Sequence, residues 1–387
     1  MSQVIKLCQE LVRRPSVNSE VDETMNFLQQ SLTAHGFSVR LLAFENERGQ
    51  KVTNLCASYG SGSPHLLFVG HADVVAAGSE DMWRYPPFAA TIDNNVLYGR
   101  GVADMKGGIA CFAQACYNYI SQNPKFNGKI TYIISGDEEE PIVRGTQKVL
   151  EQLHREGEIF DFALVGEPSN PLCMGDEIKI GRRGDMVVHL HSYGKQGHTA
   201  YANSRDNPIY YLINLLQQLQ QDKPDNGNAY FQPSVVQVTT IDVGNPASNV
   251  VPQAAHAVVD IRFNSEHTLQ QIETWVQHKI QHVGGHIEAQ FEPIGEAFLS
   301  PINQHITLLQ QIISRHTGKT PAFSTAGGTS DARFVRQYCP VAEYGLTNAT
   351  IHQINECEKT ENIEILCDIY QEFLEKFFGA NSFDQHL

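Results

Sequence analysis

The chain has 387 residues, of which 41% are hydrophobic and 18% are charged. This length and composition are typical of a globular protein with at least one large core, and we expect it to divide into two domains. The formal net charge of −15 argues against nucleic acid or an anionic membrane as the main partner, because both bind basic surfaces.

Residues 1–180 alternate between helical and strand-like runs. Ser2 is a candidate N-cap for a first helix that ends at Arg14, before Pro15, and a second helix is expected from about Ser19 to His35. Strand-like runs follow at 39–44, 52–59, 66–69, 129–135 and 162–165, with helical runs at 108–121 and 146–154. This alternation predicts an α/β fold with a largely parallel sheet.

The segment 181–293 has a different character. Its expected elements are, in order, a strand at 186–192, a helix at 208–221, strands at 235–242 and 256–263, a helix at 269–282 and a strand at 287–291. That order predicts a two-helix, four-strand α+β unit of the ferredoxin-like kind. We therefore expect a discontinuous α/β domain, formed by 1–180 and 294–387, with a smaller domain inserted at 181–293.

The rest of the chain returns to the α/β pattern. A helix is expected at 306–316, a strand at 341–346 and a terminal helix at 361–378, followed by a loose end at 381–387. The sequence has no run of 18 apolar residues and no secretory-signal layout, so we expect a cytoplasmic protein. Its eight cysteines include no Cys-x-x-Cys pair, which indicates reduced thiols rather than disulfides or a thiolate zinc site.

Metal-type ligands follow several of the predicted strands. In open α/β sheets, reactive side chains gather at the carboxyl ends of the strands. The candidates here are His71 and Asp73, Asp104, the acidic run 137–140, Glu167 and, near the C-terminus, His352. Imidazoles and carboxylates without sulfur suit Zn, Mn or Co, and a catalytic zinc site keeps a position open for water.

Each of these features also has a simpler interpretation. A histidine at a strand end is more often a hydrogen-bonded structural residue, and a run of glutamates is usually a solvated surface or a helix start. An aspartate after Gly-x-Gly is usually a turn or cap residue. The Gly-rich run 99–107 could also be read as a nucleotide loop, but it lacks the glycine spacing of either phosphate-binding motif. Five such signals in one order favour the metal site.

Together, the motifs resemble the co-catalytic zinc amidohydrolases of the M20 peptidase family. The shared motifs are GHAD at 70–73, YGRGVADMKG at 98–107, SGDEE at 135–139, VGEP at 165–168 and GH at 197–198. Three further stretches resemble the branch of the family that removes succinate from N-succinyl-LL-2,6-diaminopimelate: GRRG at 181–184, GGTSD at 327–331 and NATIHQINE at 348–356. The match runs over nearly the whole chain.

The resemblance implies a catalytic site with two zinc ions, for which Co or Mn are possible substitutes. His71 and Glu167 would hold one ion, Glu139 and His352 the other, and Asp104 would bridge them. Asp73 would hydrogen-bond the far nitrogen of His71 and fix its tautomer. Glu138 would be the general base, although Glu139 and Glu140 could be the working pair if the frame is shifted. The family typically places a Gly-Thr pair six residues after the ligand glutamate. Gly145-Thr146 has this spacing from Glu139, which favours Glu139 as the ligand and Glu138 as the base.

The resemblance also implies a homodimer, with the inserted domain serving as its dimerisation and lid domain. His198 would reach across the dimer interface to stabilise the oxyanion, and the helix at 207–221 with a neighbouring edge strand would form that interface. An anionic N-acyl amino-acid substrate would be bound by side chains at six positions: Arg182, Arg262, Tyr201, Asn249, Thr329 and Asn348. Asp185 departs from the serine usual there, and its charge would oppose an anionic substrate unless it pairs with Arg183.

The implied activity is desuccinylation in bacterial lysine and diaminopimelate biosynthesis. Other activities of the family remain alternatives, namely deacylation of acetylornithine or of another N-acyl amino acid, and dipeptide cleavage. A catalytically silent metal-binding relative is a further alternative, but such a protein could lose its base or a ligand, and Glu138 and all five ligand positions are present in this chain.

Overall fold

The computed structural model describes residues 1–140 and 142–379, so the expected loose end at 381–387 lies outside the described residues. The chain divides into two compact units. The larger unit comprises Met1–Ile180, Ser300–Phe323 and Ser330–Leu387, and the smaller unit comprises Gly181–Leu299 and Ser324–Thr329. The expected division after residue 180 coincides with the first of these limits, whereas the expected end of the insertion at 293 falls short of Leu299.

An eight-stranded sheet, in the order β1-β2-β6-β3-β7-β18-β8-β17, forms the centre of the larger unit. Its strands are β1 (Ser38–Glu45), β2 (Lys51–Ser61), β3 (His65–His71), β6 (Gly128–Ser135), β7 (Phe162–Val165), β8 (Glu177–Lys179), β17 (Ala322–Ser324) and β18 (Val341–Glu343). The central strands β6, β3, β7 and β18 run parallel, but β1, β2 and β8 pair antiparallel. The sheet is therefore mixed rather than largely parallel, because the hairpin β1-β2 joins β6 in the opposite direction.

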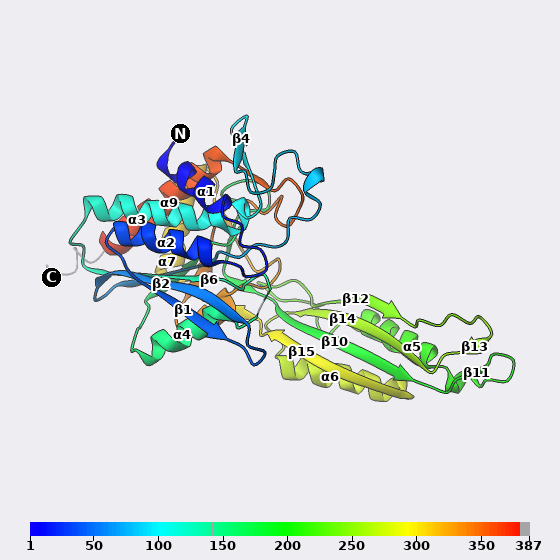
Figure 1. Cartoon of the computed structure of the whole chain (residues 1–387). Helices are drawn as coiled ribbons and strands as arrows, with labels where there is room; N and C mark the ends of the chain where they lie inside the picture. Colours follow the sequence, from blue (N-terminus) through cyan, green and yellow to red (C-terminus); the bar gives the residue numbers. More distant parts are fainter. Residues whose placement is uncertain (141, 380–387) are drawn as a thin grey trace. The chain divides into compact units, whose positions relative to one another are not determined.

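Helices cover both faces of this sheet. They are α1 (Gln3–Val12), α2 (Asp22–Ala34), α3 (Gly107–Gln122), α4 (Gly145–Arg155), α7 (Gln304–Thr317), α8 (Ala332–Val335) and α9 (Thr360–Gly379). Helix α3 packs against α1 and α9 on one face, and α4 lies on the opposite face (Figure 1). A strand covered on both faces must be apolar on both, and every residue of β3 is buried.

Short elements that the sequence did not predict flank the main sheet. A three-stranded sheet contains β4 (Thr91–Asp93), β5 (Val96–Tyr98) and β19 (Cys357–Lys359), and two turns are η1 (Glu80–Met82) and η2 (Val102–Lys106). No helix in the part of the chain that the structure describes combines the length and the apolar character needed to cross a bilayer.

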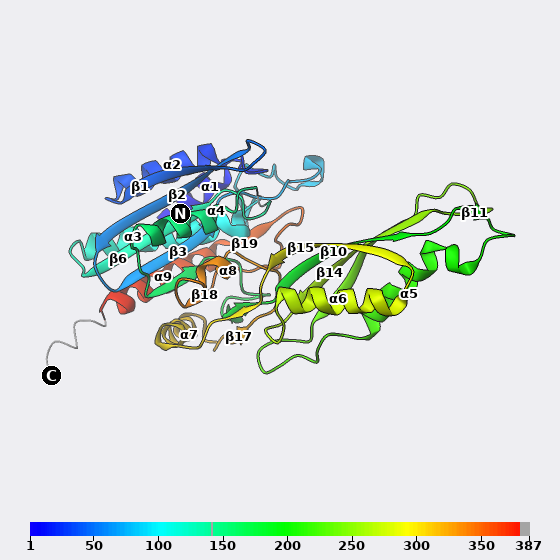
Figure 2. The same ribbon diagram turned by 90° about the horizontal axis from the view of Figure 1, so that it is seen from below.

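The smaller unit has an antiparallel sheet in the order β12-β14-β10-β15. Its main elements are β10 (Gly184–Tyr193), α5 (Pro208–Gln221), β12 (Val235–Asp242), β14 (Ala254–Phe263), α6 (Leu269–Val283) and β15 (His286–Gly295). Short pieces are β9 (Gly181–Arg182), β11 (Gly197–His198), η3 (Ser204–Asp206), β13 (Val250–Val251) and β16 (Phe298–Leu299). Helices α5 and α6 cover one face of the sheet and enclose its core (Figure 2). The four strands and two helices follow the order expected from the sequence.

Candidate metal centre

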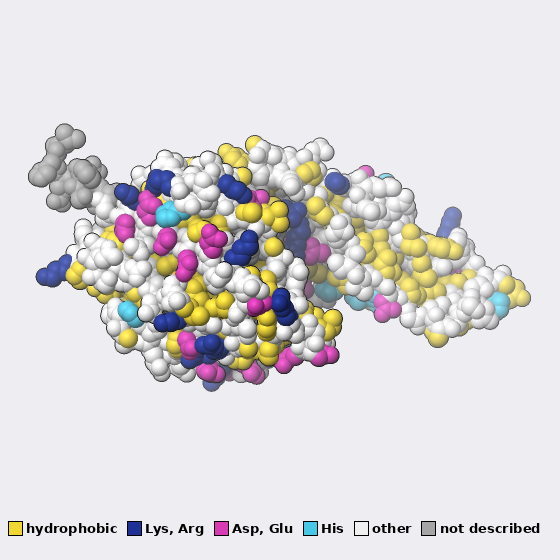
Figure 3. Space-filling model, turned by 90° about the horizontal axis from the view of Figure 1, so that it is seen from above, with side chains coloured by type: hydrophobic (Ala, Val, Ile, Leu, Met, Phe, Trp, Pro, Cys, Tyr) yellow, Lys and Arg dark blue, Asp and Glu magenta, His cyan; other side chains and the backbone are white. Residues whose placement is uncertain are grey.

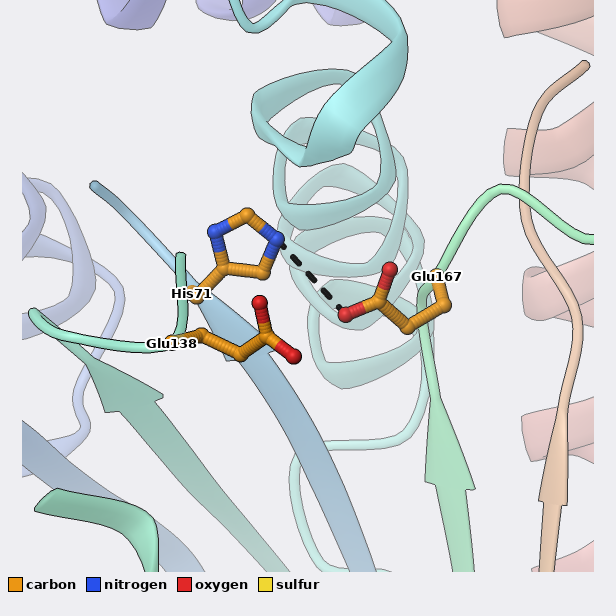
Figure 4. A group of neighbouring side chains, drawn as sticks. All are labelled: His71, Glu138 and Glu167. Carbon is orange, nitrogen blue, oxygen red and sulfur yellow. Dashed lines mark ion pairs between the residues drawn. The ribbon is translucent and has the colours of Figure 1, made fainter. Parts of the chain in front are cut away.

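Three parallel strands bring His71, Glu138 and Glu167 together. Residue His71 ends β3, Glu138 follows β6 and Glu167 follows β7, and these strands are neighbours in the sheet. Because parallel strands end at the same edge, their side chains converge there, as Figure 4 shows. The Nε2 atom of His71 lies 3.6 Å from Oε1 of Glu167, and one ligand atom from each of the three residues lies within 4.8 Å of the others.

Asp104 stands between two imidazoles. Its Oδ1 lies 3.1 Å from Nε2 of His71, and its Oδ2 lies 3.3 Å from Nε2 of His352. The same nitrogen of His352 is 3.0 Å from Oε1 of Glu139. The Asp104 carboxylate therefore lies between two groups of side chains. One group is His71 with Glu167, and the other is His352 with Glu139. This is the arrangement that a carboxylate bridging two metal ions requires.

The turn that carries Asp104 depends on glycine. Gly101 has a φ of 85°, a conformation that favours glycine, and a Cβ there would lie 2.5 Å from a methyl group of Val74. The motif Gly99-Arg-Gly101 is therefore explained by the close fit of this turn, without a phosphate.

His352 has a φ of 60°, which is uncommon for a residue other than glycine and is typical of functional sites.

Electrostatics at the site reflect an excess of carboxylates. Burial opposes a charge on His71, but Asp104 and Glu167 outweigh it and raise the pKa of His71 well above its ordinary value. Hydrogen bonds to Asp104 and Glu139 raise the pKa of His352 to about 10. Burial also opposes ionisation of Asp104, yet the two histidines hold its pKa well below its usual range.

The donor set fits divalent cations. Carboxylate and imidazole ligands suit zinc, manganese and cobalt, and bound cations are the natural counter-charge for several converging carboxylates. Two groups of side chains among the described residues have metal-site geometry, namely His71, Glu138 and Glu167, and His71, Asp104 and Glu139. The first of these includes Glu138, so geometry alone leaves Glu138 as either a ligand or a neighbouring base.

The alternative assignment of the acidic run, with Glu139 and Glu140 as the working pair, is not supported by the geometry. Glu139 points to His352 and Glu138 belongs to the group with His71, whereas Glu140 is exposed. Asp137 is buried and accepts hydrogen bonds from the backbone N–H groups of residues 142–145, at 2.7–3.1 Å. It orders the segment after the glutamates and does not belong to either metal-type group.

Asp73 supports the site differently from the sequence prediction. Nδ1 of His71 donates to the main-chain carbonyl of Asp73 at 2.9 Å, and the carboxylate of Asp73 lies 3.7 Å from that nitrogen. The expected hydrogen bond to His71 is therefore made by the carbonyl. Because a carbonyl only accepts, Nδ1 carries a hydrogen and Nε2 faces the carboxylates. The Asp73 carboxylate instead accepts from the backbone N–H groups of Glu138 and Glu139, at 3.2 and 2.9 Å.

Substitution Asp73→Ala is expected to weaken metal binding about 10- to 100-fold, the usual range for groups that orient ligands. The loop bearing Glu138 and Glu139 loses the acceptor of two backbone N–H groups, whereas the carbonyl contact to His71 remains. Competition titration of zinc with a chromophoric chelator measures the change. Asp73→Asn keeps one acceptor oxygen and should fall between wild type and Asp73→Ala, and equal affinities for all three proteins would contradict this role.

Glu356 supports the opposite side of the site and was not assigned a role from the sequence. Its carboxylate accepts from the backbone N–H groups of Gly101, Ala103 and Asp104 at 2.9, 2.9 and 3.2 Å. It also forms a buried ion pair with Arg100 at 2.8 Å. Glu356 therefore fixes the turn that presents Asp104. The only sequence signal was the place of Glu356 at the end of the motif at 348–356.

Three residues that the sequence analysis assigned to the site belong to the smaller unit: His198, Tyr201 and Asn249. His198 is exposed on β11, and its Nδ1 accepts a hydrogen bond from the backbone N–H of Ala200 at 3.1 Å. In the neutral ring, the hydrogen is therefore on Nε2, which is the donor that an oxyanion needs. Tyr201 is 89% exposed, and the carbonyl of Asn249 accepts from Thr199 N–H across the β11-β13 pair.

The two arginines expected to bind substrate differ in their surroundings. Arg182 on β9 is buried and donates a hydrogen bond to the carbonyl of Gly328 at 3.1 Å. Gly328 immediately precedes Thr329 in the chain. Arg262 contacts the carboxylates of both Asp185 and Asp260. Asp185 therefore pairs with Arg262, not with Arg183 as considered from the sequence. Asn348 belongs to the larger unit, where its backbone N–H donates to the carbonyl of Asn170.

The fold and the site define an α/β protein with metal-type groups of histidines and carboxylates at the edge of its main sheet. Residues 67–376 match the family described as Peptidase family M20/M25/M40. The chain belongs to this family.

Two curated relatives are similar over nearly their whole length. Both are named succinyl-diaminopimelate desuccinylase. The one from Maricaulis maris is 45% identical over 379 residues, 97% of this chain and 95% of the relative. The one from Rhodospirillum centenum is 42% identical over 376 residues, 97% of each chain.

Solved structures of more distant proteins share the fold. An M20 family metallo-carboxypeptidase from Sulfolobus solfataricus has a TM-score of 0.78 at 17% identity, covering 98% of this chain and 100% of its own. A dinuclear metal-binding peptidase of the M20 family from Bacillus subtilis has a TM-score of 0.70 at 16% identity, covering 98% and 97%. At these identities, the likeness shows the fold alone.

Proposed function

We propose that this protein is a metal-dependent amide hydrolase that removes succinate from N-succinyl-LL-2,6-diaminopimelate. The product is LL-2,6-diaminopimelate, a precursor in bacterial lysine biosynthesis. The observation that carries the proposal is the position of Asp104, whose two oxygens face His71 and His352 at 3.1 and 3.3 Å. The choice of substrate is supported by the two relatives named for this activity, at 45% and 42% identity over 97% of the chain.

Five residues would hold two zinc ions, with cobalt or manganese as substitutes. His71 and Glu167 would hold one ion, His352 and Glu139 would hold the other, and Asp104 would contact both. Bound cations of this kind acidify a water molecule and polarise the carbonyl of the scissile amide. Asp73 and Glu356 position the loops that carry these ligands.

Glu138 is the general base of the proposed reaction. Burial and the neighbouring Glu167 raise the pKa of Glu138 well above its ordinary value, which moves this carboxyl toward the range useful for proton transfer at neutral pH. It takes a proton from the attacking water and returns that proton to the amine that leaves. Glu139 is assigned to the metal in this proposal, and its contact with His352 supports that assignment.

A homodimer completes the site in this proposal, because His198 of one subunit serves the active site of the other. Four exposed apolar side chains support such an interface: Tyr210 and Ile213 on α5, and Val238 and Ile241 on β12. In Figure 3, hydrophobic side chains gather on the smaller unit, to the right of the view. Strand β12 is also an edge of its sheet and keeps unpaired backbone groups for a second copy.

The double substitution Ile213→Glu and Ile241→Lys is expected to produce monomers with less than about 1% of wild-type activity, because losing an oxyanion donor costs about 100- to 1,000-fold. Analytical ultracentrifugation and turnover measured on the same sample test this. Leu172→Glu replaces an even more exposed apolar residue of the larger unit and should leave both unchanged. A fully active monomer would contradict the role of His198.

Substrate contacts are proposed for Arg182, Tyr201, Asn249, Thr329 and Asn348, which offer hydrogen-bond donors to the carboxylates of the substrate. The part played by Arg262 depends on its pairing with Asp185 and Asp260. We place the enzyme in the cytoplasm, where its amino-acid precursor is expected, and propose no nucleic acid or membrane as partner, in keeping with the net charge of −15.

Steady-state hydrolysis of N-succinyl-LL-2,6-diaminopimelate, beside N-acetylornithine and a dipeptide, tests the function. The zinc-loaded protein should hydrolyse the succinyl compound, and treatment with a chelator should abolish that activity until zinc is restored. Preference for the acetyl compound or the dipeptide would move the protein to another activity of the family. No turnover of any substrate would contradict the hydrolase proposal.

A further inference from the structure

The guanidinium of Arg262 is already surrounded by carboxylates. Its Nε and Nη2 donate to the two oxygens of Asp260 at 2.8 and 2.9 Å, and its Nη1 lies 2.9 Å from Oδ2 of Asp185. These three side chains carry two negative charges and one positive charge. A further carboxylate that approached Arg262 would therefore meet a net negative charge, so this arginine is poorly suited to bind an anionic acyl group.

This cluster lies on the face of the β12-β14-β10-β15 sheet that is opposite its helices. Asp185 on β10 pairs in register with Arg262 on β14, and the two strands lie side by side (Figure 2). Met186, Val188 and Leu190 on β10 pack into the core beneath the helices. Because side chains alternate along a strand, Asp185 points to the other face. Arg183 lies just before β10, between that strand and β9.

Arg183 stands near this cluster without a counter-ion of its own. The Nε atom of Arg183 is buried and has no hydrogen-bond partner, and its guanidinium has no ion pair with any carboxylate of residues 1–140 and 142–379. Burial and then the positive charge of Arg262 lower the pKa of Arg183 from its ordinary value, whereas Asp260 acts in the opposite direction. A half-buried guanidinium with an unmet donor is stabilised by a bound anion.

We propose that Arg183, and not Arg262, binds the terminal carboxylate of the acyl group, while Asp185 and Asp260 hold Arg262 as a structural partner. The inference rests on the proposed function, because it assigns a residue to the succinyl group of that substrate. A guanidinium presents parallel N–H groups that match both oxygens of a carboxylate. Because Asp185 occupies Arg262 in this chain, Arg183 recognises that carboxylate instead of Arg262.

Hydrolysis of two substrates by two matched variants tests the proposal. The substrates are N-succinyl-diaminopimelate and N-butanoyl-diaminopimelate, which lacks the terminal carboxylate but keeps the acyl chain length. Arg183→Gln should lower kcat/KM for the succinyl substrate about 10- to 100-fold, mainly through KM, because a hydrogen-bonded charge is lost. The butanoyl substrate should change less than about twofold, since Arg183 meets no carboxylate there.

Arg262→Gln is the matched control. It removes the same kind of side chain, but it breaks the contacts of Arg262 with Asp185 and Asp260 and disturbs the sheet. Any loss of activity should therefore be equal for the two substrates, so that their ratio of kcat/KM stays at the wild-type value. A selective loss of the succinyl substrate in Arg262→Gln, with the ratio unchanged in Arg183→Gln, would overturn the proposal.

Asp185→Asn gives a second, independent test. It removes one negative charge from Arg262 while keeping the size of the side chain, so Arg262 becomes available to an anion. The ratio of kcat/KM for the succinyl over the butanoyl substrate should rise several-fold. An unchanged or lower ratio would contradict the idea that Asp185 withholds Arg262 from the substrate.

Binding of free succinate separates this inference from the proposed function. Isothermal titration should show weaker binding of succinate to Arg183→Gln than to the wild type, whether or not the protein hydrolyses either diaminopimelate derivative. A wild-type protein that binds succinate through Arg183 but cleaves neither substrate would refute the function alone. Equal succinate binding by wild type and Arg183→Gln would refute the inference alone.

Discussion

Glu138→Gln is expected to lower kcat for the succinyl substrate about 100- to 10,000-fold, the range for loss of a general base. The amide of glutamine has almost the size of the carboxylate but cannot take a proton from water. Because the five proposed ligands are untouched, the protein should still bind two zinc ions. Turnover and the zinc content of the same preparation, measured after gel filtration, provide the result.

The acidic run supplies its own controls. Glu140→Gln changes an exposed neighbour and should leave both kcat and zinc content within about twofold, as is usual for surface substitutions. Glu139→Gln removes the partner of His352 and should lose one zinc ion. If Glu138→Gln also lost a zinc ion, Glu138 would be a ligand and not the base. This outcome is worth testing because Glu138 lies beside His71 and Glu167.

Much of this site is predictable because a parallel sheet gathers the ends of its strands. His71, Glu138 and Glu167 lie far apart in the sequence, yet each follows a strand-like apolar run, so their meeting at one edge follows from the pattern. The hydrophobic runs also predict most helices and strands of both units. The antiparallel pairing of β1 and β2 was not predicted, because strand direction depends on connections and not on the apolar pattern of one strand.

The sequence does not show which atom makes a contact. Two residues after His71, a carboxylate was expected to fix the imidazole, but the carbonyl of Asp73 does so and the carboxylate binds the neighbouring loop. Likewise, Arg183 was the partner considered for Asp185 from the sequence, but the register of β10 with β14 places Arg262 opposite Asp185. Such choices depend on distances of a few ångströms between segments far apart in the chain.

Glu356 shows the same limit most clearly. It lies about 250 residues from the turn it supports, so no local pattern connects them. Only the folded chain brings β19 beside β5 and places the preceding residue, Glu356, against Gly101 and Asp104. The sequence marks the motif at 348–356, but the structure gives the reason for its last residue.

Glu356→Ala is therefore expected to destabilise the larger unit by about 3–5 kcal/mol, the cost of breaking a buried ion pair by removing one partner. The side chains of Arg100 and Glu356 are only 2% and 1% exposed, so Arg100 would keep an uncompensated buried charge. Three backbone N–H groups would also lose their acceptor. Urea unfolding followed by the fluorescence of Trp83, in a Trp275→Phe background, reports on this unit.

An exposed ion pair of equal length is the control for burial. Arg84 and Asp93 are also 2.8 Å apart, but they are 55% and 29% exposed, so Asp93→Ala should cost less than about 1 kcal/mol. Replacing both buried partners, with Arg100→Met and Glu356→Gln, should recover part of the loss, since no charge is then left buried. If Glu356→Ala cost no more than Asp93→Ala, the pair would not stabilise the turn, and the position of Asp104 would need another cause.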